Sequence, residues 1–495
     1  SNKMIWRWDT TSSNRYTLST ASEDIAKSVD DPVTVTAYFS SNLPPQLELT
    51  REQFQNFLDE FRAYSNGQVE YRFINPNEDD QTEQEAQQAG IRPLMIDVRE
   101  RDQVTQRRAY LGAVFQYGEK KEVVPVIQPG AALEYTIAST IKQLTVEQKS
   151  KIGVLQGNGE PGLQAMRQLQ QELGQMYEVQ EVSGIDTTAV PPEIEVLMVV
   201  APENELSTEE LLAIDQYIMA GGKAVFAINR INADVQRGRA NVLNTGIERL
   251  LASYNIPVNA NLIRDAQSSR IQVRQQQGGM SFINQVQYPY IPMISSFADH
   301  PITEGLETAV FQFVSSVDVS QADSTQDITV LATSSDKAGI DQGRFNLSPM
   351  QEWTANDFAQ ANIPLGALVE GTFRSHFAGN DTLDVTLAES GSNSVVVFGD
   401  GDFIINGEGQ QQQRLPEDNI NLMVNAVDYL ADDTGLIALR TKGVTNRPIK
   451  NIEDSTKNLL RYGNLLAPIF IVLGYGFYRY QRRKARRQKW IEKGI

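Results

Sequence analysis

The sequence predicts an α/β protein that ends in a transmembrane helix, and three features carry this prediction. Its 495 residues are 41% hydrophobic and 21% charged, which is ordinary globular usage and enough chain for about three domains. Continuous apolar runs, typical of parallel strands buried on both faces, alternate with amphipathic helices from residue 151 onward. Residues 462–478 contain no charge and precede a strongly basic tail.

The first predicted domain spans residues 16–146. A polar-apolar alternation at 33–39 predicts a strand, and apolar residues at i, i+3, i+4 and i+7 within 49–64 predict an amphipathic helix. Further strands are expected at 69–74, 94–99, 108–117 and 121–127, with helices near 83–89 and 131–144. This order of elements resembles the thioredoxin fold, but the chain has no cysteine for a redox dithiol.

The second predicted domain is a doubly wound α/β unit. Its strands are expected at 151–157, 177–182, 194–202, 223–229 and 394–404. Ser207 and Glu210 have the spacing of a capping box, which predicts that a helix begins there. Between the two parts of this unit the pattern changes to shorter strands, and the Gln-rich stretch 272–279 is expected to be a mobile loop.

These patterns divide the chain as follows: a first domain at 16–146, the first part of the second domain at 150–254, a β-rich insertion or small third domain at 255–390, the return to the second domain at 391–435, a juxtamembrane connector at 436–461, a transmembrane helix at 462–480 and a basic cytoplasmic tail at 481–495.

Composition excludes several chemistries. Without cysteine the chain has no disulfides, no cysteine-ligated zinc, no iron–sulfur cluster and no cysteine nucleophile, and two histidines are too few for a histidine-rich metal site. We therefore expect no metal and no cofactor. The Walker A pattern is also absent, so any ATPase must be a separate subunit.

Charge is unevenly distributed along the chain. The net charge is −18, yet residues 479–495 hold eight Lys or Arg against one Glu, which leaves −25 on the rest. The high negative charge of residues 1–478 argues against nucleic-acid binding, because contacts with phosphate groups need a basic surface.

The loop at Gly157, Asn158, Gly159 and Glu160 is the first candidate site, because backbone N–H groups between a strand and a helix can bind an anion. It lacks the third glycine of a dinucleotide fingerprint, and Glu160 would repel phosphate. We therefore favour a structural turn for this loop.

Asp400, Asp402 and Asn406 form the second candidate, since two carboxylates and an amide could contact a hard cation. Their spacing departs from the calcium-loop pattern, and turn-forming Asp and Gly are the simpler interpretation. His300 and His376 are the only imidazoles, and no G-x-S-x-G elbow accompanies them, so His300 is expected to hydrogen-bond a turn before Pro301 rather than to act in catalysis.

Residues 462–480 are the predicted membrane anchor. The uncharged run is near the lower limit for crossing about 30 Å of hydrocarbon, and tyrosines stand where an aromatic belt would place them. The positive-inside rule puts the basic tail in the cytoplasm, near anionic lipid, and the acidic bulk in the periplasm. Residues 1–10 lack an apolar signal segment, so either the C-terminal span acts as a tail anchor or another span precedes residue 1, and we favour the second. The anchor residues are Tyr462, Pro468, Tyr478, Arg479, Arg482 and Arg483.

Seven segments together resemble the GldG family of gliding-motility-associated ABC-transporter auxiliary proteins, often labelled substrate-binding. They are RYTLS (15–19), DDPVTVTAYFSSNLPP (30–45), GNGEP (157–161), ELSTEELLAIDQYIMAGGKAVFAIN (205–229), HPITEGL (300–306), VLATSS (330–335) and VVVFGDGDFIIN (395–406), all before a C-terminal span. The resemblance implies that the second domain has the class I glutamine-amidotransferase-like fold shared with an intraflagellar-transport protein. Enzymes of that fold use a Cys–His pair, which this chain lacks, and Asn158 stands where family members commonly have His.

The resemblance implies a non-enzymatic subunit in the bacterial inner membrane, with its bulk outside, that docks with a permease and a separate ATPase. It could capture an unknown ligand or couple the permease to envelope machinery, and we favour coupling. Two alternatives stay open: a membrane-anchored hydrolase or carbohydrate-active enzyme using Asp400 and Asp402, and an envelope scaffold without a transporter.

Overall fold

The computed structural model describes residues 18–100, 103–129, 132–146, 149–187, 189–235, 237–277, 280–321, 324–379, 387–409, 412–432 and 435–439, together with Tyr475, Arg479 and Tyr480. The chain divides into two compact units, 1–443 and 444–495. Apart from those three residues, the predicted anchor at 462–480 and the tail at 481–495 lie outside the described residues, and so do residues 1–10. None of the helices in the described part is long and apolar enough to cross a bilayer.

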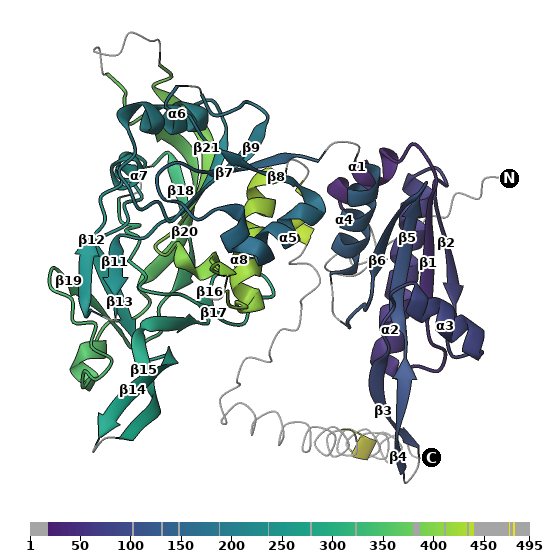
Figure 1. The fold of residues 1–495 in the computed structure, drawn as a ribbon. Coiled ribbons are helices and arrows are strands. Elements are labelled where there is room, and N and C mark those ends of the chain that lie inside the picture. Colours follow the sequence, from purple (N-terminus) through teal and green to yellow (C-terminus); the bar gives the residue numbers. More distant parts are fainter. Residues whose placement is uncertain are drawn as a thin grey trace, which may run out of the picture. The chain divides into compact units, whose positions relative to one another are not determined.

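A four-stranded sheet in the order β2-β1-β5-β6 forms the core of the first region (Figure 1). β1 (Val33–Phe39) is parallel to β2 (Val69–Ile74) and antiparallel to β5 (Leu111–Tyr117), which pairs with β6 (Lys120–Val124). One face of the sheet is covered by α1 (Thr20–Lys27), α2 (Pro45–Tyr64) and α4 (Leu133–Thr145), whose apolar side chains share one core with Val35 and Phe39. α3 (Asp80–Gln88) packs through Ala86 beside Tyr38 in a separate cluster, because successive β1 side chains point to opposite faces.

The sequence predicts two strands between residues 94 and 117, but the structure has three. β3 (Leu94–Glu100) and β4 (Gln103–Ala109) form a separate two-stranded hairpin before β5 begins. β4 has the sequence QVTQRRA, which is mostly polar and lacks the alternation of polar and apolar residues that is typical of a half-buried strand. Pairing with β3 defines this strand, and such pairing is not visible in a local hydropathy pattern.

An eight-stranded sheet in the order β16-β18-β20-β21-β10-β9-β7-β8 forms the core of residues 149–432. Its parallel part consists of β7 (Lys151–Leu155), β8 (Glu178–Val182), β9 (Ile194–Val200), β10 (Lys223–Ala227) and β21 (Ser390–Phe398). Its antiparallel edge consists of β20 (Pro364–Arg374), β18 (Gln326–Thr333) and β16 (Ser296–Phe297).

Helices cover both faces of this sheet. The 3-10 turn η1 (Leu163–Met166), α5 (Arg167–Met176) and α8 (Glu417–Ala431) share a core with Val196, Met198 and Val200 of β9. α6 (Thr208–Met219) and α7 (Ile247–Ser253) share another core with Leu197 and Val199 of the same strand. The apolar run at 194–200 therefore reflects a strand buried on both faces, as the sequence predicts.

The β-rich region 255–390 supplies β16, β18 and β20 to the edge of the main sheet. Smaller sheets accompany them: β11 (Ile231–Asp234) with β12 (Arg239–Val242), β13 (Asn261–Asp265) with β19 (Ala338–Gln342), and β14 (Ser268–Gln277) with β15 (Met280–Ile294) and β17 (Ala309–Val310). The remaining 3-10 turns are η2 (Ala355–Phe358), η3 (Asp402–Ile404) and η5 (Leu436–Leu439).

The expectation of a mobile loop at 272–279 is wrong for residues 272–277. These residues belong to β14, and each of them pairs with a residue of β15, beginning with Gln272 opposite Gln285. A run of glutamines has no hydropathy pattern that predicts a strand. These residues form a strand because their backbone pairs with β15, which the local sequence does not show.

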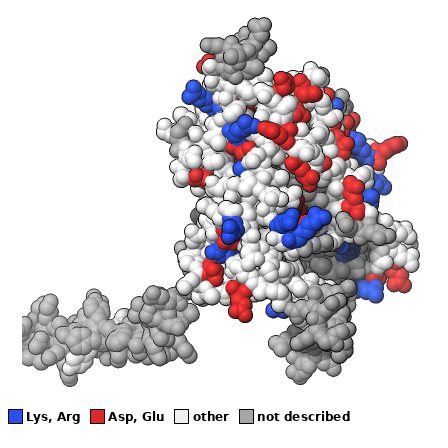
Figure 2. Space-filling view, turned by 60° about the vertical axis from the view of Figure 1, so that its left-hand side comes forward, with Lys and Arg blue, Asp and Glu red and all other residues white. Residues whose placement is uncertain are grey.

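Acidic and basic side chains are interspersed on the face of the molecule that Figure 2 shows. No large basic patch is visible among the described residues on that face.

Candidate functional site

The carboxyl ends of the parallel strands bring the two candidate motifs of the sequence to one edge of the sheet. The loop after β7 carries Asn158 and Glu160, and the turn after β21 carries Asp402. Glu203 follows β9 and Asn229 follows β10 at the same edge. Ligands of open α/β sheets bind outside the carboxyl ends of the strands, so this edge is the first place to look for a site.

The loop after β7 is closed by its own hydrogen bonds. The carbonyl oxygen of Asn158 accepts from the backbone N–H groups of Glu203 and Asn204, both at 2.9 Å. The N–H of Asn158 donates to Glu160 Oε2 at 2.6 Å, and its side chain donates to Glu210 Oε1 at 3.0 Å. A carboxylate of the protein thus occupies the N–H that an anion would need.

Glu160 is 8% exposed, and its Oε1 has no hydrogen-bond partner among the described residues. Burial raises the pKa of Glu160, and the nearby carboxylate of Glu210 raises it further, while backbone N–H groups oppose the shift.

Asp400 is completely buried and serves the fold. Its Oδ2 accepts from the N–H of Gln312 and its Oδ1 from the N–H of Asp402, both at 2.7 Å. Burial raises the pKa of Asp400 well above its ordinary value, and the charge of Asp402 acts in the same direction.

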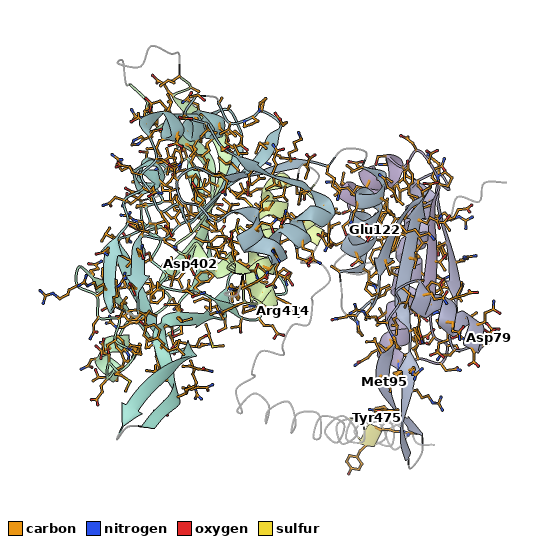
Figure 3. The ribbon with its side chains drawn as sticks, viewed as in Figure 1. Asp79, Met95, Glu122, Asp402, Arg414 and Tyr475 are labelled. Carbon is orange, nitrogen blue, oxygen red and sulfur yellow. The ribbon has the colours of Figure 1, made fainter. Side chains whose placement is uncertain are left out.

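Asp402, labelled in Figure 3, is half-buried at this edge. Its Oδ1 accepts from Asn229 Nδ2 at 3.0 Å, and Asn229 Oδ1 in turn accepts from the N–H of Gly401 at 2.8 Å. Burial raises the pKa of Asp402, the hydrogen bond from Asn229 lowers it, and the charge of Glu203 raises it. Of the two predicted carboxylates, Asp402 is therefore the one that a ligand could reach.

Asn406 does not join these carboxylates. Its Oδ1 accepts from the N–H of Gln168 at 3.1 Å and its Nδ2 donates to the carbonyl of Gln413 at 3.0 Å. It lines a cavity of about 800 Å³ between α5 and α8, which also holds Arg414 (Figure 3). Within the described ranges, no group of three His, Asp or Glu side chains is placed to hold a metal ion.

The two histidines lie apart from these carboxylates in the hydrogen-bond network. His300 Nδ1 accepts from the N–H of Ile302 at 3.3 Å, and its ring centre lies 4.9 Å from that of Tyr429. Burial lowers the pKa of His300, although the charge of Glu370 opposes this. His376 Nδ1 lies 2.6 Å from Ser253 Oγ, a pair that no sequence motif predicts.

Three further residues at this edge, Asn229, Glu203 and Glu210, are not among the candidates that the sequence suggests. Glu203 directly follows one predicted strand and Asn229 is the last residue of another, so the rule that ligand sites lie at carboxyl ends draws attention to both. Glu210 was assigned only to its capping box, where its Oε2 accepts from the N–H of Ser207 at 2.7 Å.

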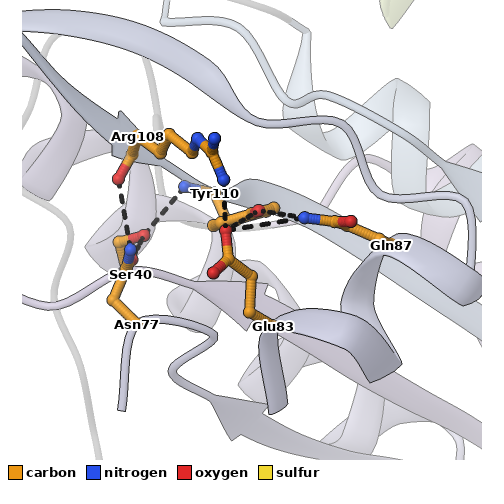
Figure 4. A network of polar contacts seen from close by, with 6 residues as sticks. All are labelled: Ser40, Asn77, Glu83, Gln87, Arg108 and Tyr110. Carbon is orange, nitrogen blue, oxygen red and sulfur yellow. Dashed lines mark hydrogen bonds and ion pairs between the residues drawn. The ribbon is translucent and has the colours of Figure 1, made fainter. Parts of the chain in front are cut away.

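A second polar network lies in the first region (Figure 4). The buried Tyr110 hydroxyl donates to Glu83 Oε1 at 2.7 Å and accepts from Gln87 at 3.0 Å, while Arg108 lies 3.2 Å from the same carboxylate. Tyr110 first and Arg108 second lower the pKa of Glu83. Ser40 accepts from the Tyr110 N–H at 2.8 Å, so this network joins the end of β1 to α3 and β5.

Residues 149–430 match a protein family described as an ABC-type uncharacterized transport system. The chain belongs to this family. Membership links the chain to an ABC-type transport system as an auxiliary component. This part of the sequence-based prediction, the association with a transporter, is confirmed. Residues 12–116 match a family described only as a domain of unknown function, DUF7088.

This chain is also similar to individual proteins over more than half of its length. An uncharacterized protein of Borreliella burgdorferi is 23% identical over 497 residues, covering 97% of this chain and 94% of the relative. The solved N-terminal domain of mmIFT52 shares 14% identity, with 57% of this chain and 97% of that chain covered and a TM-score of 0.36. A thua-like protein from Parabacteroides merdae shares 11% identity over 57% and 90% of the two chains, with a TM-score of 0.29. At these scores the two structural likenesses carry no argument.

Proposed function

We propose that this chain is a non-enzymatic, membrane-anchored extracytoplasmic subunit of an ABC transporter, and that it couples the permease to envelope machinery. The family match over residues 149–430 is the observation that carries the proposal. The sheet edge supports it, because the Asp400 carboxylate and the N–H of Asn158 are both occupied by the fold itself. Coupling through protein surfaces needs no free acid–base pair.

The finer parts of the proposal rest on the sequence. The uncharged run at 462–478 and the basic residues after it support an anchor in the inner membrane with a periplasmic body. The seven GldG-like segments support a role in gliding motility or related envelope machinery. The sheet order β2-β1-β5-β6 supports a thioredoxin-like first domain, and the five parallel strands support an amidotransferase-like second one.

The test is a purification of the full-length chain from native membranes in mild detergent, followed by mass spectrometry. We expect a multi-span permease and a P-loop ATPase to co-purify. A known transporter complex in the same membranes serves as the control for preservation. If that complex survives and neither partner is recovered with this chain, the transporter proposal is wrong and an envelope scaffold is favoured.

One observation favours the hydrolase alternative. Asp402 has a raised pKa and lies half-buried where ligands of α/β sheets bind, which is a common property of catalytic acids. The discriminating variant is Asp402→Asn, with Asp327→Asn on the exposed side of β18 as the matched control. Loss of a measured glycan or ester hydrolysis in Asp402→Asn alone, with unchanged melting temperature, would show that the non-enzymatic proposal is wrong.

A further inference from the structure

β14 offers an unpaired edge. The small sheet has the order β14-β15-β17, so in the described part of the chain β15 is the partner of β14 on one side and no strand pairs with the other. From Arg270 to Gln277 the pairing with β15 runs without a register shift. Figure 1 shows this hairpin projecting away from the eight-stranded sheet. An unpaired, regular edge presents N–H and C=O groups to which an extended peptide can add as a further strand.

The charge around this edge differs from that of the rest of the protein. Residues 266–298 contain no Asp or Glu, although the whole chain has 62 of them and a net charge of −18. Arg270 and Arg274 lie on β14 itself. The Arg270 side chain is exposed, and within the described ranges no carboxylate forms an ion pair with it.

A cavity of about 420 Å³ lies at the start of β14. It is lined by the turn at 266–268, by β15 and by the turn at 335–337. Ser268 lines it, is 9% exposed, and has an Oγ without a hydrogen-bond partner among the described residues. This Oγ is itself buried, so the polar contacts that the cavity offers to a ligand come from its exposed lining rather than from Ser268. Lys337 and Asp336 are exposed at the rim.

The walls of the cavity are held by one buried carboxylate. Asp265 is completely buried and accepts from Ser335 Oγ at 2.6 Å, from the Ser335 N–H at 2.7 Å and from the Gln267 N–H at 2.8 Å. The two turns that form the cavity are thereby fixed to each other before any ligand arrives. A site that is already formed loses little affinity to reorganisation.

We propose that β14 and this cavity bind an extended, acidic polypeptide segment of a partner protein by strand addition. The main chain of the segment pairs with the free edge of β14, and its carboxylates lie near the exposed side chains of Arg270 and Lys337. A basic segment is disfavoured because the 266–298 region supplies no carboxylate, which leaves Asp336 alone at the rim. Pairing of two copies through β14 would bring the arginine-bearing strand of one copy against that of the other, so like charges would meet. The inference goes beyond the proposed function, because peptide binding requires no transporter.

The test measures fluorescence anisotropy of a labelled octapeptide of alternating Val and Glu, added to the full-length chain in detergent. An octapeptide of alternating Val and Lys is the comparison ligand. We expect the acidic peptide to bind, the basic one to bind at least tenfold more weakly, and Arg270→Glu or Lys337→Glu to weaken acidic-peptide binding by about fivefold each, as for charges at an interface rim.

Arg239→Glu is the matched control, because Arg239 is an exposed arginine on β12, which belongs to a different, two-stranded sheet. Its effect should be less than twofold. Equal weakening by Arg239→Glu would mean that overall charge is responsible, and equal binding of the two peptides would remove the charge argument; either result overturns the proposal.

Hydrogen exchange of the same samples locates the binding. Amides of 268–277 should become protected when the acidic peptide is added. Absence of protection there overturns the proposal even if the peptide binds. Protection that instead appears without peptide as protein concentration rises would show that a second copy occupies the edge, and the peptide proposal would be wrong.

Discussion

Gly159→Ala is the sharpest test of the closed loop after β7. Gly159 has φ +85°, and a Cβ there would lie 2.9 Å from Asn204 Nδ2 and 3.1 Å from Glu203 Cβ. Gly184, in the loop after β8, has φ +71°, but a Cβ there meets nothing within 4 Å. The two substitutions therefore share the backbone cost and differ in the contact with the β9 loop.

The magnitudes follow from this difference. Placing alanine in the left-handed region costs about 1 kcal/mol, which is the whole expected effect of Gly184→Ala. Overpacking against Glu203 and Asn204 adds about 1–3 kcal/mol at Gly159, so the expected total is about 2–4 kcal/mol. For a region of this size each 1 kcal/mol lowers Tm by about 2–4 °C.

Scanning calorimetry of the full-length variants measures the two shifts. We expect Gly159→Ala to lower the Tm of the transition that contains the eight-stranded sheet at least twice as much as Gly184→Ala does. Equal shifts would refute the reasoning, because they would mean that the loop after β9 moves aside without cost and that the two loops are not locked together.

Three further outcomes are expected. Burial lowers the pKa of His300, so the unfolded chain binds a proton at this residue more readily than the folded chain does, and stability is lost as pH falls through about 6.5. The Tm of His300→Gln should therefore fall less between pH 7 and pH 5 than the Tm of the wild type. The control variant is His376→Gln. Tyr110→Phe should cost about 1–2 kcal/mol, measured as a lower denaturant midpoint, because the buried hydroxyl no longer links Glu83 to Gln87; an unchanged midpoint would contradict a stabilising role for this network. Asp265→Ala should cost about 3 kcal/mol or more and speed hydrogen exchange in the turns it joins, since three donors lose their acceptor; unchanged exchange would exclude its structural role.

The sequence was most informative where a local pattern reports burial or capping. The apolar run of β9 predicted a strand buried on both faces, and Ser207 with Glu210 predicted the start of α6 through a capping box that the structure contains. Both signals depend on residues within a few positions of each other. Side-chain periodicity and cap geometry are set locally, so they can be read without the fold.

The sequence did not determine which distant segments meet. Asn158 and Asp402 look like separate turns along the chain, and only the parallel order of β7, β9, β10 and β21 places both at one edge. Asp400 and Asp402 are equivalent as sequence, yet burial makes the first structural and leaves the second accessible. The Gln-rich β14 is a strand because β15 pairs with it. In each case the structure is decided by burial and by strand pairing. Both depend on contacts between residues far apart in the sequence, and no local pattern contains those contacts.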